Sequence, residues 1–180
     1  MKLERNQTVL VVIDVQSKLL PVIYDYPALV ENIKKVIQGA QILGIPVVLT
    51  EQYPEGLGLT VDEIRETLSE YNPIEKMSFS CCGEENFIEK IKQLNRNKIL
   101  VCGIEAHVCI YQTCMDLLSE GYEVHLLVDA ISSRKKENRD LTVEKLHIGG
   151  VQITSVEMAL FEILKEASGN EFRKISKIIK

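Results

Sequence analysis

The fold is decided by the first buried segment of the chain, which reads Thr8-Val9-Leu10-Val11-Val12-Ile13 and is followed directly by Asp14. An aliphatic run with no polar residue inside it is typical of a strand buried on both faces, as strands of parallel sheets are. The other segments of this kind are Ile45–Thr50, Lys98–Gly103, Tyr122–Val128 and Val151–Val156. Because Asn72–Met77 is short enough to form an additional strand, the sequence predicts a sheet of about six strands.

Helical patterns separate these strands. Apolar residues recur at every third or fourth position, which is the spacing of one helix face. The predicted helices carry the segments Leu29–Ala40, Phe87–Leu94, His107–Ser119 and Arg139–His147. Thr60 and Glu63 have the spacing of a capping box for a shorter helix. Strands that alternate with helices predict an α/β fold with three layers, α/β/α, in which a Rossmann-like parallel sheet forms the middle layer.

The C-terminal part carries two more helical patterns. Leu160, Phe161 and Leu164 predict a late helix that ends near Gly169, and residues 170–180 form an amphipathic tail helix. This tail either packs on the body of the protein or serves an oligomer interface. No linker composition or internal repeat divides the chain, so residues 1–180 are predicted to form a single domain.

The composition excludes several classes of partner. The chain has 180 residues, 46% of them hydrophobic, and its net charge of −5 leaves no basic surplus for binding nucleic acid or anionic lipid. Its apolar runs fall far short of the ~20 residues that a membrane-spanning helix needs. Charged and amide residues occupy Met1–Gln7, where a secretory signal has its apolar region, so we expect a cytoplasmic protein.

The cysteines and histidines predict neither a disulfide framework nor a metal site. The chain has 5 cysteines with no Cys-x-x-Cys pair among them. Its 3 histidines, His107, His125 and His147, lack the spacing that presents two imidazoles on one helical face. We therefore expect reduced thiols and no bound metal.

Three chemically active side chains follow predicted strands, where the ligand crevice of an open parallel sheet lies. Asp14 is partly desolvated there and could act as a general base, or it could only cap a turn. Cys109 falls at the predicted start of a helix, whose dipole is expected to lower the pKa of a thiol, although buried structural cysteines are commoner. Lys76 is a weak candidate by itself, since most lysines are solvated surface charges. Together they supply the base, stabiliser and nucleophile of thiol acyl transfer.

These residues lie within segments that resemble the isochorismatase-like (cysteine hydrolase) superfamily, which includes nicotinamidases and N-carbamoylsarcosine amidase. The resemblance covers nearly the whole chain and is carried by Val12–Gln16, by Lys76 and by Val101–Cys109. Further segments are similar to the isochorismatase domain-containing subgroup, namely Thr50–Gly58, Phe79–Ser80, Gly103–Cys109 and Asp129–Arg134.

The resemblance implies a catalytic triad of Asp14, Lys76 and Cys109. It also implies a cis peptide bond between Ile104 and Glu105, in a turn that holds the substrate oxyanion together with Cys109. The retained cysteine implies attack on a carbonyl or nitrile carbon, with an amide or ureido bond as the first choice. Self-association into a homo-oligomer is expected as well.

Nicotinamidases carry an Asp-x-His metal motif after the second strand, and this chain departs from it. The sequence there reads Thr50-Glu51-Gln52-Tyr53, without a histidine, so neither a bound metal nor nicotinamide as the substrate is expected. The turn-rich connection Glu51–Gly58 begins just past the strand end and is predicted to be a loop that faces the ligand.

The sequence thus predicts a hydrolase that needs neither metal nor cofactor and that cleaves a C–N bond of a small molecule through a Cys109 thioester. Two polar residues are candidate substrate contacts: Gln16, whose amide lies near Asp14, and His107, which could instead help cap the helix before Cys109. The other candidates are aromatic or aliphatic residues, of types that more often belong to a core, namely Tyr53, Phe79, Ile110 and Tyr111. Two alternatives stay open. One is a catalytically silent binding or scaffold protein of the same fold, and the other is a thiol redox sensor in which Cys109 pairs with Cys81 or Cys114.

Overall fold

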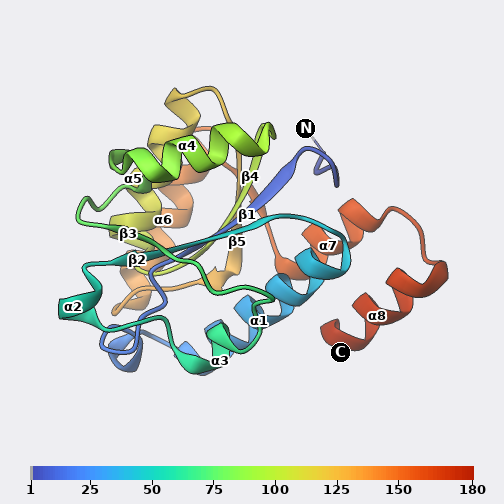
Figure 1. Ribbon diagram of the computed structural model, residues 1–180, viewed down its shortest axis with the longest axis horizontal. Coiled ribbons are helices and arrows are strands. Elements are labelled where there is room, and N and C mark those ends of the chain that lie inside the picture. Colours follow the sequence, from blue (N-terminus) through green and yellow to red (C-terminus); the bar gives the residue numbers. More distant parts are fainter. Residues whose placement is uncertain (1) are drawn as a thin grey trace.

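A six-stranded parallel sheet forms the centre of the computed structural model, which describes residues 2–180 (Figure 1). The strands follow one another across the sheet in the order β3-β2-β1-β4-β5-β6. Their bounds are Thr8–Ile13 (β1), Val47–Gln52 (β2), Ile74–Lys76 (β3), Lys98–Gly103 (β4), Glu123–Ile131 (β5) and Gln152–Thr154 (β6). The predicted α/β fold with a central parallel sheet is confirmed.

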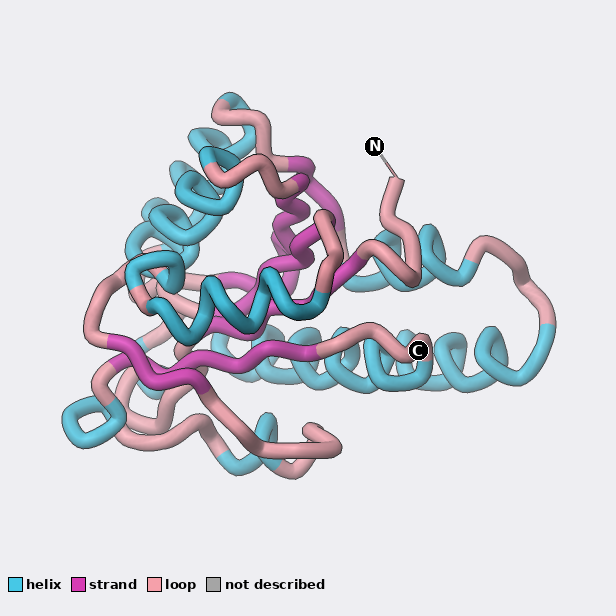
Figure 2. The backbone as a smooth tube through the Cα atoms, turned by 45° about the horizontal axis from the view of Figure 1, so that its top comes forward, coloured by secondary structure: helices cyan, strands magenta, loops and turns pink. Residues whose placement is uncertain are grey.

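Helices cover both faces of the sheet, so that the protein has three layers (Figures 1 and 2). One face carries α1 (Tyr26–Ile42), α3 (Asp62–Arg65), α7 (Val156–Leu164) and α8 (Gly169–Ile179). The opposite face carries α4 (Glu85–Leu94), α5 (Tyr111–Ser119) and α6 (Lys136–Ile148). Shorter helical turns are η1 (Leu20–Val22), α2 (Pro54–Leu57), η2 (Cys81–Gly83) and the π-helical η3 (Ala106–Ile110).

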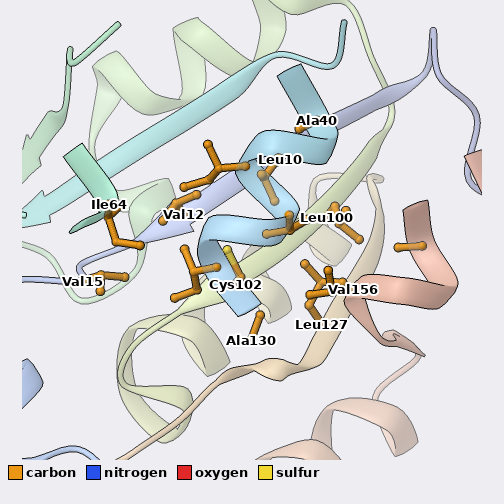
Figure 3. Packing of buried hydrophobic residues seen from close by; sticks show 14 of the residues in the cluster. Leu10, Val12, Val15, Ala40, Ile64, Leu100, Cys102, Leu127, Ala130 and Val156 are labelled. Carbon is orange, nitrogen blue, oxygen red and sulfur yellow. The ribbon is translucent and has the colours of Figure 1, made fainter. Parts of the chain in front are cut away.

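Strand β1 is buried along its whole length because both of its faces meet helices. Leu10 and Val12 point into the cluster beneath α1, whereas Val9 and Val11 point into the cluster beneath α4 and α5. Figure 3 shows the first cluster, in which Leu10 and Val12 lie near Cys102 of β4. This alternation explains why Val9–Ile13 contains no polar residue, since successive side chains of a strand point to opposite faces and both faces are covered.

The segment after β2 differs from the prediction. Glu51 and Gln52 belong to the strand, and Pro54–Leu57 forms the short helix α2 rather than an open loop. The predicted capping box is wrong, because Thr60 does not cap α3. Its hydroxyl and its N–H instead donate hydrogen bonds to Glu51 Oε1, at 2.7 and 2.6 Å. A tertiary contact thus replaces the local one.

The bounds of other predicted elements shift as well. β2 begins at Val47 instead of Ile45, and β5 continues to Ile131. β6 is limited to Gln152–Thr154. The late helix α7 ends at Leu164, and Gly169 begins the tail helix instead of ending the one before it.

The amphipathic tail packs on the body of the protein. Helix α8 lies beside α1 and α7 (Figure 2), with Ile175 fully buried in the core cluster of that face. The rings of Phe161 and Phe172 join α7 to α8 at a centroid distance of 6.4 Å. Among residues 2–180, no helix combines the length and the apolar character that crossing a membrane requires.

The strand order creates a topological switch point at the carboxyl ends of β1 and β4. β1 lies between β2 and β4, so the chain turns to one side after β1 and to the other side from β4 onward. At such a switch point the connections that follow the two central strands diverge, and a ligand can bind between them. Asp14 follows β1 at this edge, and the turn that leads to Cys109 follows β4.

We expect Gly103 to be required for the close approach of β1 and β4 at their carboxyl ends. Its φ is +121°, and a Cβ at this position would lie 2.1 Å from the carbonyl oxygen of Ile13. Gly150, with a φ of +102° and no atom within 4 Å of such a Cβ, is a matched control. Both alanine variants are expected to lose about 1–2 kcal/mol through backbone strain. Urea denaturation should show that Gly103→Ala loses at least about 2 kcal/mol more, because a backbone clash is added. Equal losses would contradict this account.

Candidate active site

Asp14 and Lys76 form an ion pair that is excluded from solvent. Asp14 Oδ2 accepts a hydrogen bond from Lys76 Nζ at 2.7 Å, and both side chains have 0% exposure. Lys76 is the last residue of β3, and Asp14 comes directly after β1, two strands away. The structure therefore brings together two of the three side chains that the sequence singled out.

The backbone of Asp14 turns sharply at the end of β1. Its φ is +54°, in the left-handed region that aspartate tolerates better than most residues. Its N–H donates to the carbonyl of Thr50 at 3.2 Å, and its own carbonyl accepts from the N–H of Gln16 at 2.8 Å. Its side-chain Oδ1 accepts a hydrogen bond from Thr50 Oγ1 at 2.7 Å. Each oxygen of the carboxylate thus accepts at least one hydrogen bond.

Lys76 has several acceptors besides Asp14. Its Nζ donates to Gln52 Oε1 at 2.7 Å, and the carbonyls of Phe79 and Ser78 lie at 3.1 and 3.3 Å. Burial is the largest single effect and would lower the pKa of this amine, but the charge of Asp14, its hydrogen bond and the contributions of Cys81 and Cys109 together outweigh it. The pKa of Lys76 is therefore raised, and the side chain is a cation at neutral pH.

Cys109 lies in the π-helical turn η3 that precedes α5, and only 7% of the residue is exposed. Burial raises the pKa of its thiol, and the neighbouring Asp14 carboxylate raises it further, although Lys76 opposes both. The expectation that a helix N-terminus would lower this pKa is wrong, because desolvation outweighs the dipole. The thiol is neutral at rest, beside a carboxylate that can accept its proton.

The turn between β4 and Cys109 is fixed by contacts to other segments. The peptide bond between Ile104 and Glu105 is cis. The N–H of Ile104 donates to the carbonyl of Ile13 at 2.9 Å, so this group is not available to bind an oxyanion as the sequence had suggested. Glu105 Oε2 accepts from the backbone N–H and from Nε of Arg134, at 3.0 and 3.2 Å. His107 Nδ1 lies 3.0 Å from Ser133 Oγ.

The candidate substrate contacts differ in how far they are exposed. Gln16 and Ile110 are fully buried. The amide of Gln16 bonds to the backbone of Gln52 in both directions and also donates to the carbonyl of Gly58, so it is occupied within the protein. Tyr53 and Phe79 are 45% and 56% exposed and are anchored near Lys76 through their backbones. Tyr111 is half-buried, and the Lys145 amine lies 4.6 Å from the centroid of its ring.

Thr50 and Gln52 hold the ion pair and were not predicted as site residues. Thr50 donates to Asp14, and Gln52 accepts from Lys76. Both are polar residues at the buried end of β2, beside the end of β1. A polar residue at the carboxyl end of a buried parallel strand is the signal that could have found them.

Glu51, which lies where the resemblance places a metal motif, contacts protein groups instead. Its Oε1 accepts hydrogen bonds from Thr60 and from the hydroxyl of Tyr71, the latter at 2.5 Å. Burial and this carboxylate raise the pKa of Tyr71 to about 12. Within the described residues 2–180, no group of three or more His, Cys, Asp and Glu side chains is arranged to hold a metal ion.

Comparisons with known proteins agree on one family. The family described as "Isochorismatase domain" matches residues 8–158. The secreted isochorismatase effector Isc1 of Phytophthora sojae is 39% identical over 97% of this chain and 85% of its own length. The isochorismatase domain-containing protein 2 of Danio rerio is 36% identical over 99% of this chain and 89% of its own.

Solved structures have the same fold. A structure described as the MAR1 ribonuclease of Caenorhabditis elegans superimposes with a TM-score of 0.93, at 34% identity, covering 99% of this chain and 92% of that one. The YcaC gene product of Escherichia coli, described as an octameric hydrolase of unknown specificity, gives a TM-score of 0.93 at 17% identity, covering 99% and 89% of the two chains.

Replacement of Lys76 by methionine is expected to lower the free energy of unfolding by about 3–5 kcal/mol, because Asp14 would be left as an uncompensated buried charge. Lys98 offers a matched control. Its side chain is only 9% exposed, but its partners Glu4 and Glu123 are 48% and 21% exposed and can be hydrated. Lys98→Met should therefore cost about 1 kcal/mol in the same denaturant titration at pH 7.

Adding Asp14→Asn to Lys76→Met should recover part of the loss, since no unpaired charge remains. Equal losses for the Lys76 and Lys98 variants would show that the Asp14–Lys76 pair is not desolvated as described.

Alkaline pH is expected to destabilise the protein through its thiols. Burial raises the pKa of all five cysteines, to about 12 for Cys81 and about 11 for Cys82. A raised pKa in the folded state favours folding below the pKa of the unfolded thiol, about 8.5, and this advantage is lost as the pH rises. Each thiol contributes up to about 1.4 kcal/mol per pH unit above that point. Chemical denaturation between neutral pH and pH ~10.5 should give a shallower decline for Cys102→Ala, and an unchanged slope would contradict the prediction.

Proposed function

The chain belongs to the isochorismatase family, and on this premise we propose that it is a cysteine hydrolase that cleaves an amide or ureido C–N bond of a small molecule. Membership in the family supports a hydrolase-like function. The nature of the bond and the roles of the residues are inferred from the site.

One observation carries the proposal, namely a fully buried carboxylate–lysine pair beside a thiol at the switch point of the sheet. A buried ion pair is weak evidence for stability, because apolar residues often replace such a pair without loss. Buried charges next to a nucleophile are instead typical of catalytic sites. Since the thiol of Cys109 has a raised pKa, it needs a base, and Asp14 is a carboxylate in position to act as one.

In the proposed reaction Asp14 takes the proton of the Cys109 thiol as the sulfur attacks the carbonyl carbon of the substrate. The resulting tetrahedral oxyanion is held by N–H groups of the turn that contains Glu105 and Cys109. Collapse of this intermediate breaks the C–N bond, and the proton on Asp14 passes to the departing nitrogen. Water then attacks the thioester with Asp14 again as the base, which releases the acid and restores the thiol. The Lys76 ammonium stabilises the negative charge throughout.

We propose a small neutral amide as the substrate class rather than RNA. The relative from Caenorhabditis elegans is described as a ribonuclease. This chain has a net charge of −5, and the lysine of its site is fully buried against Asp14. An RNA substrate would require cations that reach its phosphates. Residues 2–180 of this chain offer no cluster of metal-ligating side chains for an alternative chemistry. The proposed enzyme uses neither metal nor cofactor.

We further propose that the protein is a homo-oligomer, in which residues 1–180 act as one domain. The description of YcaC as an octamer supports this for the fold. Exposed apolar side chains near the site, among them Tyr53 and Phe79, are available for contacts between copies. A catalytically silent binding protein and a thiol redox sensor are the competing possibilities, which the following experiment separates from the hydrolase.

The assembly of the site can be tested without a known substrate. Iodoacetamide is added to the native protein at a series of pH values, and the alkylation of each cysteine is followed by peptide mass spectrometry. Cys109 is expected to react faster than Cys82 at neutral pH, although Cys82 is more exposed, because Asp14 takes the thiol proton. Asp14→Asn should slow Cys109 at least about tenfold, as expected when a general base is lost. Lys76→Ala should change its pH profile, and neither variant should alter Cys82.

Hydrolysis is then followed with a panel of small amides and ureido compounds and with RNA. Cys109→Ala should abolish any turnover that the native protein shows. If Cys109 in the folded protein reacts no faster than the buried thiols, the hydrolase loses its chemical basis and the binding-protein alternative leads. Peroxide that joins Cys109 to another cysteine in a disulfide, without turnover of any amide, would favour the redox sensor.

A further inference from the structure

A chain of buried polar groups continues from Asp14 away from Lys76. Thr50 Oγ1 donates to Asp14 Oδ1 at 2.7 Å, and the thiol of Cys81 donates to Thr50 Oγ1 at 3.9 Å. The backbone N–H of Cys81 in turn donates to Thr113 Oγ1 at 2.9 Å. Thr50, Cys81 and Thr113 are all 0% exposed. The proposed reaction gives these groups no role, although polar groups are costly to bury.

The hydrogen bonds from Cys81 through Thr50 to Asp14 all run in one direction while Asp14 carries its negative charge. The carboxylate only accepts, so the single proton of the Thr50 hydroxyl must point toward Asp14. A lone pair of Thr50 then faces the Cys81 thiol, which points its proton at that oxygen. In this arrangement every hydrogen of the Thr50–Cys81 pair is used, and the carboxylate is stabilised in its charged form.

The direction reverses when the proton that Asp14 takes lies on Oδ1 and faces Thr50. The new O–H donates to Thr50 Oγ1, and the Thr50 hydroxyl turns its own proton toward Cys81 Sγ, which accepts it weakly. The Cys81 proton turns away from Thr50, at small cost because a thiol is a weak donor. No heavy atom has to move and no bond to sulfur is made or broken. A threonine beside a thiol can thus satisfy both protonation states of Asp14.

We propose that Thr50 is the positioning residue of Asp14, and that the Thr50–Cys81 pair reverses its hydrogen bonds each time Asp14 gains or loses the proton of Cys109. This inference rests on the proposed function. It assigns a role to the second buried thiol near the site, which the sequence had offered only as a redox partner. Thr50 acts through Asp14 and does not touch the substrate.

The other groups that face Asp14 are accounted for. Lys76 of β3 binds Oδ2, the opposite oxygen, and remains a donor in both states. Cys109 of η3 supplies the proton, and Cys81 of η2 is the third titratable neighbour. Burial raises the pKa of Cys81 to about 12, so its thiol stays protonated during the exchange.

The test is the pH profile of Cys109 alkylation by iodoacetamide, measured on the full chain. The rate is expected to fall toward acid pH, and Asp14→Asn should remove this fall. Thr50→Val removes the hydrogen bond that favours the carboxylate, so the midpoint of this fall should move to higher pH by about one unit. Thr50→Ser keeps the hydroxyl and should retain the native midpoint.

Thr8→Val is the matched control for the loss of a buried threonine hydroxyl. Thr8 is 0% exposed, lies on β1 and donates to the carbonyl of Glu4 at 2.7 Å, at the opposite end of the strand. The midpoint of the Cys109 pH profile in Thr8→Val should equal that of the native protein. A fall in rate without a shift of the midpoint in Thr50→Val would indicate a merely structural role and would overturn the inference.

Cys81→Ala tests the reversal itself. Without the sulfur, the Thr50 hydroxyl has no acceptor once Asp14 is protonated. The plateau, which is the constant alkylation rate that Cys109 reaches above the midpoint of its pH profile, should therefore fall about threefold. Cys102→Ala, which removes another fully buried thiol on the far side of the sheet, should leave the plateau unchanged. Equal plateaus for Cys81→Ala and the native protein would overturn the role of Cys81.

The two levels of the proposal fail in different ways. If the native Cys109 does not react, or if its profile ignores Asp14→Asn, the proposed function fails together with the inference. If the profile depends on Asp14 but not on Thr50 or Cys81, the hydrolase stands and only the positioning role falls. Circular dichroism of each variant confirms that the rates refer to folded protein.

Discussion

The ion pair between Asp14 and Lys76 is the constraint on which the site depends. Removing two charges from water costs several kcal/mol for each ion, and only close contact with further hydrogen bonds offsets that cost. Both conditions are met here, since the contact is 2.7 Å and each partner is held by a residue of β2. The ends of β1, β2 and β3 must therefore lie side by side, and the parallel sheet secures this arrangement.

The sheet explains why residues so far apart in sequence form one site. Asp14 and Lys76 are separated by 62 positions, yet a parallel sheet brings the carboxyl ends of its strands to a common edge. Cys109 reaches the same edge through the turn after β4, which is tied to the strand before Asp14 by the bond from Ile104 N–H to Ile13. The close contact between Gly103 and Ile13 is part of the same arrangement, because no side chain fits between these two strands.

The sequence predicted the strands and helices well because burial leaves a periodic trace, as in the uninterrupted aliphatic run of β1. It also predicted Asp14 and Lys76 at strand ends, which the structure brings into contact. The contacts of Thr50, Gln52 and Thr60 escaped prediction because their partners come from other elements, and local spacing carries no record of such contacts. For Thr60 the local pattern was misleading, since Glu51 competes for the groups that would have capped α3. The pKa of Cys109 could not be predicted either, because it depends on how deeply the turn is buried.

The raised pKa of Cys109 bears on what the site can accept. At rest, the aspartate and lysine charges cancel and the thiol is neutral, so the immediate site has no net charge. A charged ligand would lose its hydration there without finding an unpaired counter-ion, which is unfavourable in a buried site. A neutral carbonyl compound incurs no such penalty. On the proposed mechanism, charge develops only as the thiol proton moves to Asp14 and the negative charge passes to the substrate oxygen, beside a lysine that is already in place. On the proposed function, the electrostatics of the resting site thus favour a neutral amide as the substrate over a carboxylate or a phosphate.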